Sequence, residues 1–432
     1  MHPRPQLPAL LIALLLAACA GGRGGRGGLA AFARADSAAI LRDVAHLASD
    51  SLEGRATGSA GNDSAAAYIA RRLERLGLRA ELQRFTARSA AAAHSGLPGE
   101  LPTQNVVAII PGSDPALRGQ YVVLGAHYDH LGRWTFGALD PDAGAVIHNG
   151  ADDNASGTAA VLELARLLSR RPPGRSVVVA LFSGEELGLL GSQYLVDHFP
   201  VPLDSVVAML NFDMVGRMRD RKLVVYGTAT AAELPAIVDS ANQRAARGAG
   251  REPLVLTATG DGFGSSDHSS FYAKDLPVLH FFTNVHDDYH RASDDVERID
   301  AGGAARVVEL AERVVREVGD RPARLTFTRT AAAPRMMSGG GGGAYFGSVP
   351  DMAAGEVKGM RISGVTPGSP ADKAGLKAGD VIVSFGGVEV TELYSYTDAL
   401  RAKQPGDVVE VVVLRNGERV TLTATLGRRG GG

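Results

Sequence analysis

The chain has 432 residues, of which 45% are hydrophobic and 21% are charged, and its formal net charge is −2. This length is enough for one large hydrophobic core and a second, smaller domain. Because 45 basic residues are balanced by 47 acidic ones, the charge gives no electrostatic basis for binding nucleic acid or another polyanion.

The first residues predict an export signal. Residues 1–18 combine a short basic start with an apolar stretch that is too short to span a bilayer as a helix. The sequence LAAC that ends at Cys19 resembles the lipobox of bacterial lipoproteins, in which cleavage leaves the cysteine lipidated at the new N-terminus. The alternative is an ordinary signal peptide cleaved near Ala20. Residues 19–33 are rich in glycine and predict a flexible tether, so we expect an exported lipoprotein of the bacterial cell envelope, anchored to a membrane and facing the periplasm.

Short apolar runs alternate with helical patterns between residues 34 and 325, which we expect to form one domain. The apolar runs are typical of buried strands and lie at 106–110, 121–126, 177–182, 206–212, 223–227 and 277–282. Apolar residues recur at helical spacing at 65–77, 156–171 and 305–319. This alternation predicts an α/β fold, a three-layer sandwich with helices on both faces of a mostly parallel central sheet. Such sheets bind ligands beyond the carboxyl ends of their strands.

Metal-binding residue types gather near these predicted strand ends. They occur in five segments, GAHYDHLG (125–132), NGADDNASG (149–157), SGEELGLLGS (183–192), NFDMVGR (211–217) and YHRASDDVERID (289–300). Imidazole and carboxylate ligands without a thiolate suit zinc. Two histidines and three carboxylates exceed the three protein ligands of a typical catalytic zinc, and they fit two metals roughly 3.5–4 Å apart that share a carboxylate.

Together the five motifs resemble those of the co-catalytic di-zinc aminopeptidases. That family includes aminopeptidase Y and bacterial leucyl aminopeptidases, and it is related to glutamate carboxypeptidase II and glutaminyl cyclase. The resemblance covers roughly residues 35–320, and the motifs occur in the order of the family. It implies a phosphorylase/hydrolase-like zinc exopeptidase fold with two Zn²⁺ per chain.

The resemblance also implies how each metal is held. Asp153 is expected to bridge the two zinc ions. Glu186 and His290 would complete one site, whereas His127 and Asp213 would complete the other. The peptide bond that follows Asp153 is cis in relatives, and the same is expected here.

Two further carboxylates take roles by the same resemblance. Glu185 is expected to be the general base that takes a proton from the attacking water and passes it to the leaving amine. Asp129 is expected to orient His127. These roles explain why two glutamates stand side by side after a buried strand, because Glu186 binds a metal while Glu185 transfers protons.

The expected function is therefore an exported zinc-dependent exopeptidase, an aminopeptidase acting on peptide or protein substrates. A carboxypeptidase or a glutaminyl-cyclase-like enzyme on the same scaffold is one alternative. A non-catalytic peptide-binding lipoprotein is another, and the presence of all five ligands together with Glu185 argues against it.

Several neighbouring residues have two interpretations. His130 and His286 lie close to the motifs but off the matching positions, so they are expected to line the pocket or to support the ligands. The segment SSDHSSF (265–271) also resembles a segment of the family, which places Asp267 and His268 near the active site; the alternative is that Ser266 or Asp267 caps a helix. Arg217 either reaches a substrate carboxylate or is a surface ion-pair partner, and the second interpretation is preferred for an arginine that follows a strand.

The C-terminal part of the chain predicts a separate small domain. Residues 326–344 end in a glycine run and predict a linker, followed by a mostly β domain at 345–428. The stretch GSPADKAGLKAGDVIVSFGGVEV (368–390) resembles the centre of a bacterial periplasmic PDZ domain. This implies that YFGS (345–348) receives the carboxylate of a peptide C-terminus that adds a strand to the sheet edge. The alternative is a groove that serves only as a packing surface.

Overall fold

The computed structural model describes two folded domains. The described residues are 1, 34–89, 97–135, 137–140, 144–260, 262, 264–330, 344–350, 358–365, 368–391, 395–396, 399–400 and 402–428. The predicted signal peptide, apart from Met1, the predicted tether and most of the predicted linker lie outside them, and the boundaries proposed for these segments stay predictions. None of the helices in the described ranges combines the length and the apolar character that crossing a bilayer requires.

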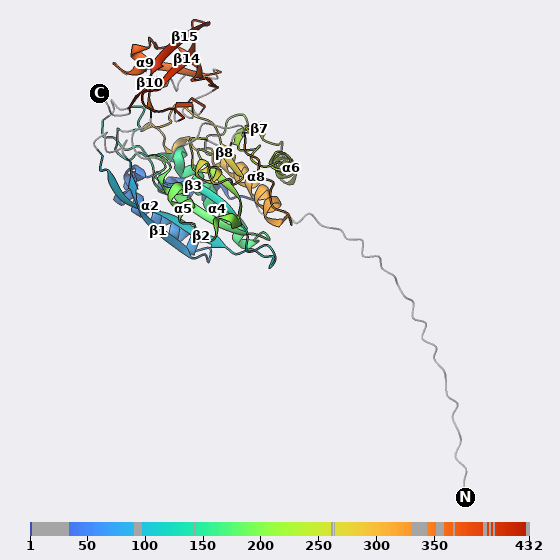
Figure 1. The fold of residues 1–432 in the computed structure, drawn as a ribbon. Coiled ribbons are helices and arrows are strands. Elements are labelled where there is room, and N and C mark those ends of the chain that lie inside the picture. The colour runs from blue at the N-terminus through green and yellow to red at the C-terminus, as the bar shows by residue number, and fades with distance from the viewer. Residues whose placement is uncertain are drawn as a thin grey trace. The chain divides into compact units, whose positions relative to one another are not determined.

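Eight strands of the larger domain form one sheet in the part of the chain that the structure describes, in the order β1-β2-β4-β3-β5-β8-β6-β7 (Figure 1). The strands are β1 (Ala80–Arg88), β2 (Glu100–Ile110), β3 (Tyr121–His127), β4 (Ser176–Phe182), β5 (Val206–Phe212), β6 (Lys222–Tyr226), β7 (Val255–Ala258) and β8 (Val278–Phe282). The central strands β4, β3, β5 and β8 are parallel. Antiparallel pairs flank them, because β2 pairs with β1 and β4, and β6 pairs with β8. The predicted mostly parallel sheet is confirmed.

The parallel register brings the carboxyl ends of the central strands to one edge. In the β3–β4 pair, Tyr121 lies opposite Ser176 and His127 lies opposite Phe182. On the other side of β3, Gly125 lies opposite Asn211 in β5. All residues of β4 and β5 are buried, as expected for strands covered on both faces.

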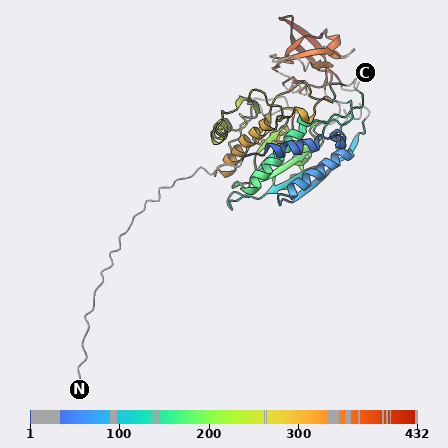
Figure 2. The ribbon, with the colours of Figure 1, turned by 180° about the vertical axis from the view of Figure 1, so that it is seen from behind.

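Helices cover both faces of the sheet, which confirms the three-layer arrangement. They are α1 (Ser37–Leu47), α2 (Ala60–Glu74), α4 (Gly157–Arg170), α5 (Leu190–Asp197), α6 (Leu234–Gly248), α7 (His268–Tyr272) and α8 (Ala301–Asp320). One apolar core joins α1, α2, α4, α6 and α8 to one face, and Figure 2 shows α1, α2, α4 and α8 side by side over the sheet. A second core packs α5 and α7 on the other face. Successive residues Val177 and Val178 of β4 belong to different cores, which is the alternation of a pleated strand.

Side-chain caps fix where three of these helices begin. Asp36 accepts a hydrogen bond from the amide of Ala39 at the start of α1. Ser59 caps α2 in the same way, and Asp300 caps α8. Each cap satisfies an amide that has no partner inside the helix, and replacing such a residue by alanine typically costs about 1 kcal/mol.

The smaller domain is built mainly from antiparallel strands around its own core. Its elements are β9 (Ala344–Tyr345), β10 (Ser348–Pro350), β11 (Met360–Val365), α9 (Pro370–Lys373), β12 (Val381–Phe385), β13 (Val388–Glu389), β14 (Val408–Arg415), β15 (Glu418–Thr425) and β16 (Gly427–Arg428). Strands β14 and β15 form a hairpin, and its two turn residues, Asn416 and Gly417, both have positive φ. Phe385 packs at the centre of this core, edge-on against Phe346 and Tyr396.

Candidate metal centre

Each of the five predicted metal ligands lies at or after the carboxyl end of a central strand or in a turn beside it. His127 ends β3, and Asp213 follows β5 directly. Glu186 lies in the loop after β4, and His290 lies in the loop after β8. Asp153 lies in the irregular helical turn that precedes α4.

The side chains of these five residues meet in two groups that share Asp153. Nε2 of His127 lies 3.3 Å from Oδ1 of Asp153 and 3.4 Å from Oδ1 of Asp213. Nε2 of His290 lies 3.1 Å from Oδ2 of Asp153 and 3.2 Å from Oε2 of Glu186. The two oxygens of Asp153 therefore face different histidines, each accompanied by a further carboxylate.

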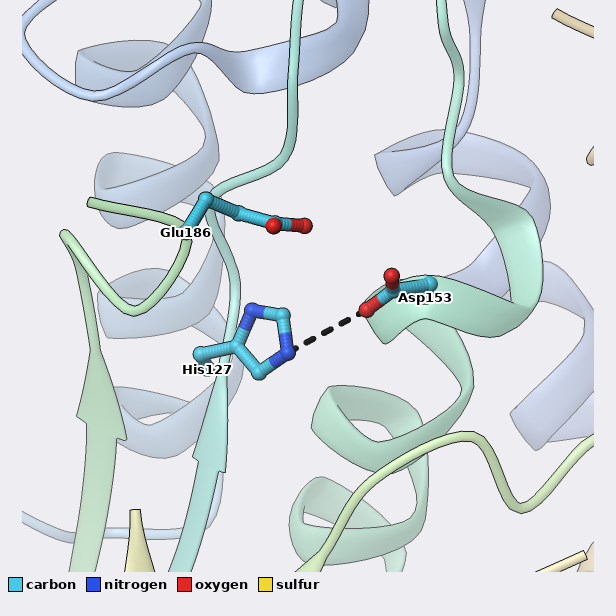
Figure 3. A group of neighbouring side chains, drawn as sticks. All are labelled: His127, Asp153 and Glu186. Carbon is cyan, nitrogen blue, oxygen red and sulfur yellow. Dashed lines mark ion pairs between the residues drawn. The ribbon is translucent and has the colours of Figure 1, made fainter. Parts of the chain in front are cut away.

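The donor set fits a divalent cation. One ligand atom each of His127, Asp153 and Glu186 lies within 4.8 Å of the other two, and the three side chains point toward a common space (Figure 3). The buried Oδ1 of Asp213 has no hydrogen-bond partner among the described residues, although it faces His127. Such a buried oxygen needs a compensating partner, and a cation would supply one. The imidazole and carboxylate donors suit zinc.

The backbone and the side chain of Asn154 fix the position of Asp153. The peptide bond between the two residues is cis. The Asn154 amide donates to the carbonyl of Phe212 at 2.9 Å, and its oxygen accepts from the amides of Met214 and Gly157. Asn154 thus ties the turn that carries Asp153 to the end of β5, where Asp213 begins the next segment.

Main-chain oxygens orient the two predicted histidine ligands. Nδ1 of His290 lies 2.8 Å from the carbonyl of Gly137, and Nδ1 of His127 lies 3.1 Å from the carbonyl of Asp129. A proton on each Nδ1 leaves each Nε2 lone pair free to face the shared carboxylate. This arrangement is the one that a metal-binding imidazole requires.

Asp129, the predicted orienting carboxylate, lies beside His127 but has other contacts as well. Its Oδ1 is 3.7 Å from Nδ1 of His127 and accepts from the amide of Glu185 at 3.3 Å. Its Oδ2 accepts from the hydroxyl of Thr57 at 2.8 Å. The buried Asp129 carboxylate therefore links the segment of the predicted ligand His127 to the segment of Glu185.

The adjacent glutamates have opposite electrostatic environments. Burial raises the pKa of the Glu185 carboxyl well above its usual range, and Glu186 adds to this effect while His127 opposes it. Burial also favours neutral Glu186, but the charge of His290 and hydrogen bonds from His130 and His290 lower its pKa to about 2. Two carboxyl groups with such different proton affinities suit a proton-transfer role and a ligand role.

Two of the residues with two interpretations, His130 and His286, contact a predicted ligand or its neighbour in the chain. Nδ1 of His130 lies 2.8 Å from Oε1 of Glu186. His286 lies 3.1 Å from Asp152. Arg217 forms the expected ion pair, with Asp288 as its partner at 2.7 Å.

The SSDHSSF segment contacts the cluster through Ser266, for which the sequence suggested only a helix-capping role. The hydroxyl of Ser266 donates to Oδ2 of Asp213 at 2.7 Å and accepts from Asn211. Asp267 and His268 are buried at the start of α7, where the Asp267 side chain makes no helix-capping hydrogen bond. The resemblance of SSDHSSF to a family segment was the sequence signal that placed it near the site, but it did not predict that Ser266 would contact Asp213.

Two family profiles match the chain. Residues 105–315 match Peptidase family M28, and residues 342–426 match PDZ domain.

Curated relatives are similar over part of their length. Leupeptin-inactivating enzyme 1 of Streptomyces exfoliatus is 29% identical over 261 residues, which are 60% of this chain and 50% of that protein. Aminopeptidase YwaD of Bacillus subtilis (strain 168) is 31% identical over 175 residues, 39% of this chain and 37% of that protein. The chain thus spans half or less of the length of these relatives.

Solved structures share the fold of the larger domain. An aminopeptidase from Aneurinibacillus sp. strain AM-1 has a TM-score of 0.53 at 17% identity, covering 69% of this chain and 97% of that one. BSAP, a zinc aminopeptidase from Bacillus subtilis, has a TM-score of 0.53 at 19% identity, covering 67% and 98%. Porphyromonas gingivalis glutaminyl cyclase has a TM-score of 0.54 at 20% identity, covering 66% and 99%. At these identities the likeness establishes the fold alone. The matched structures are those of aminopeptidases and of a glutaminyl cyclase, so the same fold carries two different activities.

Proposed function

Because residues 105–315 form a domain of peptidase family M28 and residues 342–426 form a PDZ domain, we propose that the protein is a zinc-dependent exopeptidase that releases N-terminal residues from peptides. The aminopeptidases among its relatives support this direction of trimming. The PDZ domain is proposed to bind the C-termini of peptides or proteins.

The observation that carries the proposal is the position of Asp153 between two histidines. One carboxylate oxygen faces His127 and the other faces His290, at 3.3 and 3.1 Å. Asp213 accompanies His127, whereas Glu186 accompanies His290. This division supports two zinc ions per chain with Asp153 as the shared ligand, since each cation would then have an imidazole and two carboxylates.

The chain's own groups support peptide hydrolysis. Bound zinc would polarise the scissile carbonyl and make water nucleophilic near neutral pH. Glu185 is proposed to accept the proton of the attacking water and to donate it to the leaving amine. Its raised pKa suits a group that must both take and return a proton. Asp129 is proposed to hold the loop of Glu185 in place through the hydrogen bond from the Glu185 amide.

A substrate panel with metal quantification tests the proposal. The purified chain is assayed on aminoacyl amides, on the same amides with blocked N-termini, on peptides with blocked C-termini, and on N-terminal glutaminyl peptides. We expect hydrolysis of the free aminoacyl amides and two zinc ions per chain. Release of C-terminal residues only, or cyclisation of glutaminyl peptides without hydrolysis, would contradict the aminopeptidase assignment and favour a carboxypeptidase or a glutaminyl cyclase.

Substitution of Glu185 separates proton transfer from metal binding. The Glu185→Gln variant keeps the side-chain shape but cannot act as a base, so kcat is expected to fall about 10²–10⁴-fold while zinc content stays unchanged. Glu163→Gln is the matched control, because Glu163 is also buried but pairs with Arg166 on α4. Full activity in Glu185→Gln would show that another group is the base.

The roles of the two ends of the chain are separate proposals. Deletion of residues 345–432 is expected to raise KM for long peptides and to leave KM for small aminoacyl amides unchanged. An unchanged KM for long peptides would argue that the PDZ domain does not recruit substrate. Cys19 is proposed as the lipid anchor of an envelope protein facing the periplasm, supported by LAAC, so Cys19→Ser is expected to move the protein from the membrane to the soluble fraction.

A further inference from the structure

The Asn149–Asp153 segment carries the shared carboxylate, and two buried charged residues hold its backbone from opposite sides. Arg55 donates from Nη1 to the carbonyl of Asn149 at 2.7 Å and from Nη2 to the carbonyl of Gly150 at 2.9 Å. Oδ2 of Asp294 accepts from the amides of Asp152 and Asp153, both at 3.0 Å. The main-chain oxygen of Asp294 accepts from the amide of Ala151 at 2.9 Å. Five successive residues are thus held by groups outside the segment.

Each of these two residues also connects the segment to one of the histidines that flank Asp153. Nε of Arg55 donates to the carbonyl of Tyr128 at 2.7 Å, next to His127 in the chain. Asp294 lies in the same loop as His290 and follows it by four residues. The contacts of Arg55 therefore set the spacing between Asp153 and His127, whereas those of Asp294 set the spacing between Asp153 and His290.

Both side chains have surroundings that are unusual for their charge. Arg55 and Asp294 are each 0% exposed. The hydrogen-bond acceptors of the Arg55 guanidinium are all main-chain carbonyls, the fourth being that of Leu47. The second carboxylate oxygen of Asp294, Oδ1, lies 3.8 Å from Nη1 of Arg217. Burying a charge without close pairing is costly. The fixed fork of a guanidinium can reach several carbonyls in different directions at once, which a lysine ammonium cannot reproduce.

We infer that Arg55 and Asp294 are positioning residues that orient the Asp153 carboxylate so that its two oxygens face two cations. The inference rests on the proposed metal centre and adds the two residues that preorganise it. Neither residue lies within the set of proposed ligands, and each reaches the Asn149–Asp153 segment through its main-chain groups. Residues that orient metal ligands typically affect metal affinity or activity about 10–100-fold.

The test compares zinc affinity in the full chain with wild type for Arg55→Lys, Asp294→Ala and Asp294→Asn. Zinc dissociation constants are measured by competition with a chromophoric chelator, and circular dichroism reports folding. We expect about 10–100-fold weaker zinc binding in Arg55→Lys and Asp294→Ala, and an altered ligand-field spectrum when Co²⁺ replaces zinc. In all three variants kcat is expected to fall more than KM changes. Asp294→Asn keeps an oxygen that can accept from both amides, so its zinc affinity is expected to be closer to wild type.

Two control variants measure the effect of losing a buried charged hydrogen-bonding group elsewhere. Arg175 is also 0% exposed and donates to main-chain carbonyls, including that of Val318, but it precedes β4 at the opposite edge of the sheet. Asp43 is a buried carboxylate on α1 that accepts from Tyr68 and Arg72. Arg175→Lys and Asp43→Asn are expected to lower the melting temperature but to leave zinc affinity and the Co²⁺ spectrum unchanged.

The outcomes separate this inference from the proposed function. Arg55→Lys and Asp294→Ala with the zinc affinity of the controls would overturn the inference, as would an Asp294→Asn variant that binds no better than Asp294→Ala. If Asp294→Ala does not fold, the test rests on Arg55→Lys and Asp294→Asn. Wild-type zinc affinity in both of these variants would overturn the inference. A wild-type chain that binds no divalent cation would instead overturn the proposed function, and with it this inference.

Discussion

Substitution of Gly150 by alanine is a direct test of how tightly the turn beside the metal centre is packed. Gly150 has φ of +56°, a conformation that costs about 1–2 kcal/mol for a residue with a Cβ. A Cβ atom at this position would lie 2.1 Å from the carbonyl oxygen of Asp153 and 2.4 Å from Cγ of His130. Overpacking of this kind forces neighbouring atoms to shift and typically destabilises a protein by about 1–3 kcal/mol more. The expected loss for Gly150→Ala is therefore about 2–5 kcal/mol in the free energy of unfolding.

Gly77→Ala is the matched control for the backbone cost alone. Gly77 follows α2 with φ of +79°, and a Cβ there would meet nothing within 4 Å. Its expected loss is only about 1–2 kcal/mol. Urea unfolding of both variants, followed by circular dichroism, measures the difference. Because His130 contacts Glu186, only Gly150→Ala is expected to weaken zinc binding. Equal losses of unfolding free energy in the two variants would show that a Cβ at position 150 does not meet the close contacts described above.

Three further predictions concern the small domain, a supporting histidine and the metal. Burial raises the pKa of Asp380, but hydrogen bonds from Arg415 and from the Lys377 amide lower it below its usual value. Its contribution to stability is therefore present above the unfolded pKa of about 3.9 and is lost as the pH falls through the folded value. The free energy of unfolding of the small domain is measured by urea unfolding, followed by hydrogen exchange in the full chain. It is expected to fall less with decreasing pH in Asp380→Asn than in wild type, and the same fall in both would contradict this role of Asp380. His130→Ala is expected to weaken zinc binding about 10-fold, measured by competition with a chelator. The control His198→Ala, at an exposed position, is expected to leave zinc affinity unchanged. The same zinc affinity in both variants would show that His130 does not support Glu186. Chelation of zinc is expected to abolish amide hydrolysis and added zinc to restore it, so activity that survives complete metal removal would exclude a metal-dependent reaction.

The order of strands and helices was largely predictable because burial leaves a periodic pattern. The apolar runs at 106–110, 177–182 and 206–212 each lie within a strand of the sheet. Strand β1 carries no comparable run, because it is an edge strand in which nearly all side chains are exposed or half-buried. Strand β7 is another edge strand with little buried surface. Periodicity therefore identified the strands that are covered on both faces and missed those at the edges.

The candidate ligands could be proposed from motifs, but their supports could not. His127 and Asp213 stand directly at strand ends, where position in the sheet and residue type agree. Arg55 acts on main-chain carbonyls far away in the sequence, and any residue can supply a carbonyl. Asp294 likewise accepts from main-chain amides. Contacts of this kind leave no pattern of side chains in the partner segments, so they become visible only in three dimensions.

Strand β8 lies between β5 and β6, although it is the last of the eight strands to be made. The centre of the sheet therefore cannot close until residues 278–282 have left the ribosome. His290, which completes the cluster around Asp153, follows only eight residues after the strand ends at Phe282. A nascent or truncated chain that lacks this last part holds at most an incomplete set of ligands. The candidate metal centre can therefore be complete only after the last strand of the larger domain and the loop that follows it have been made.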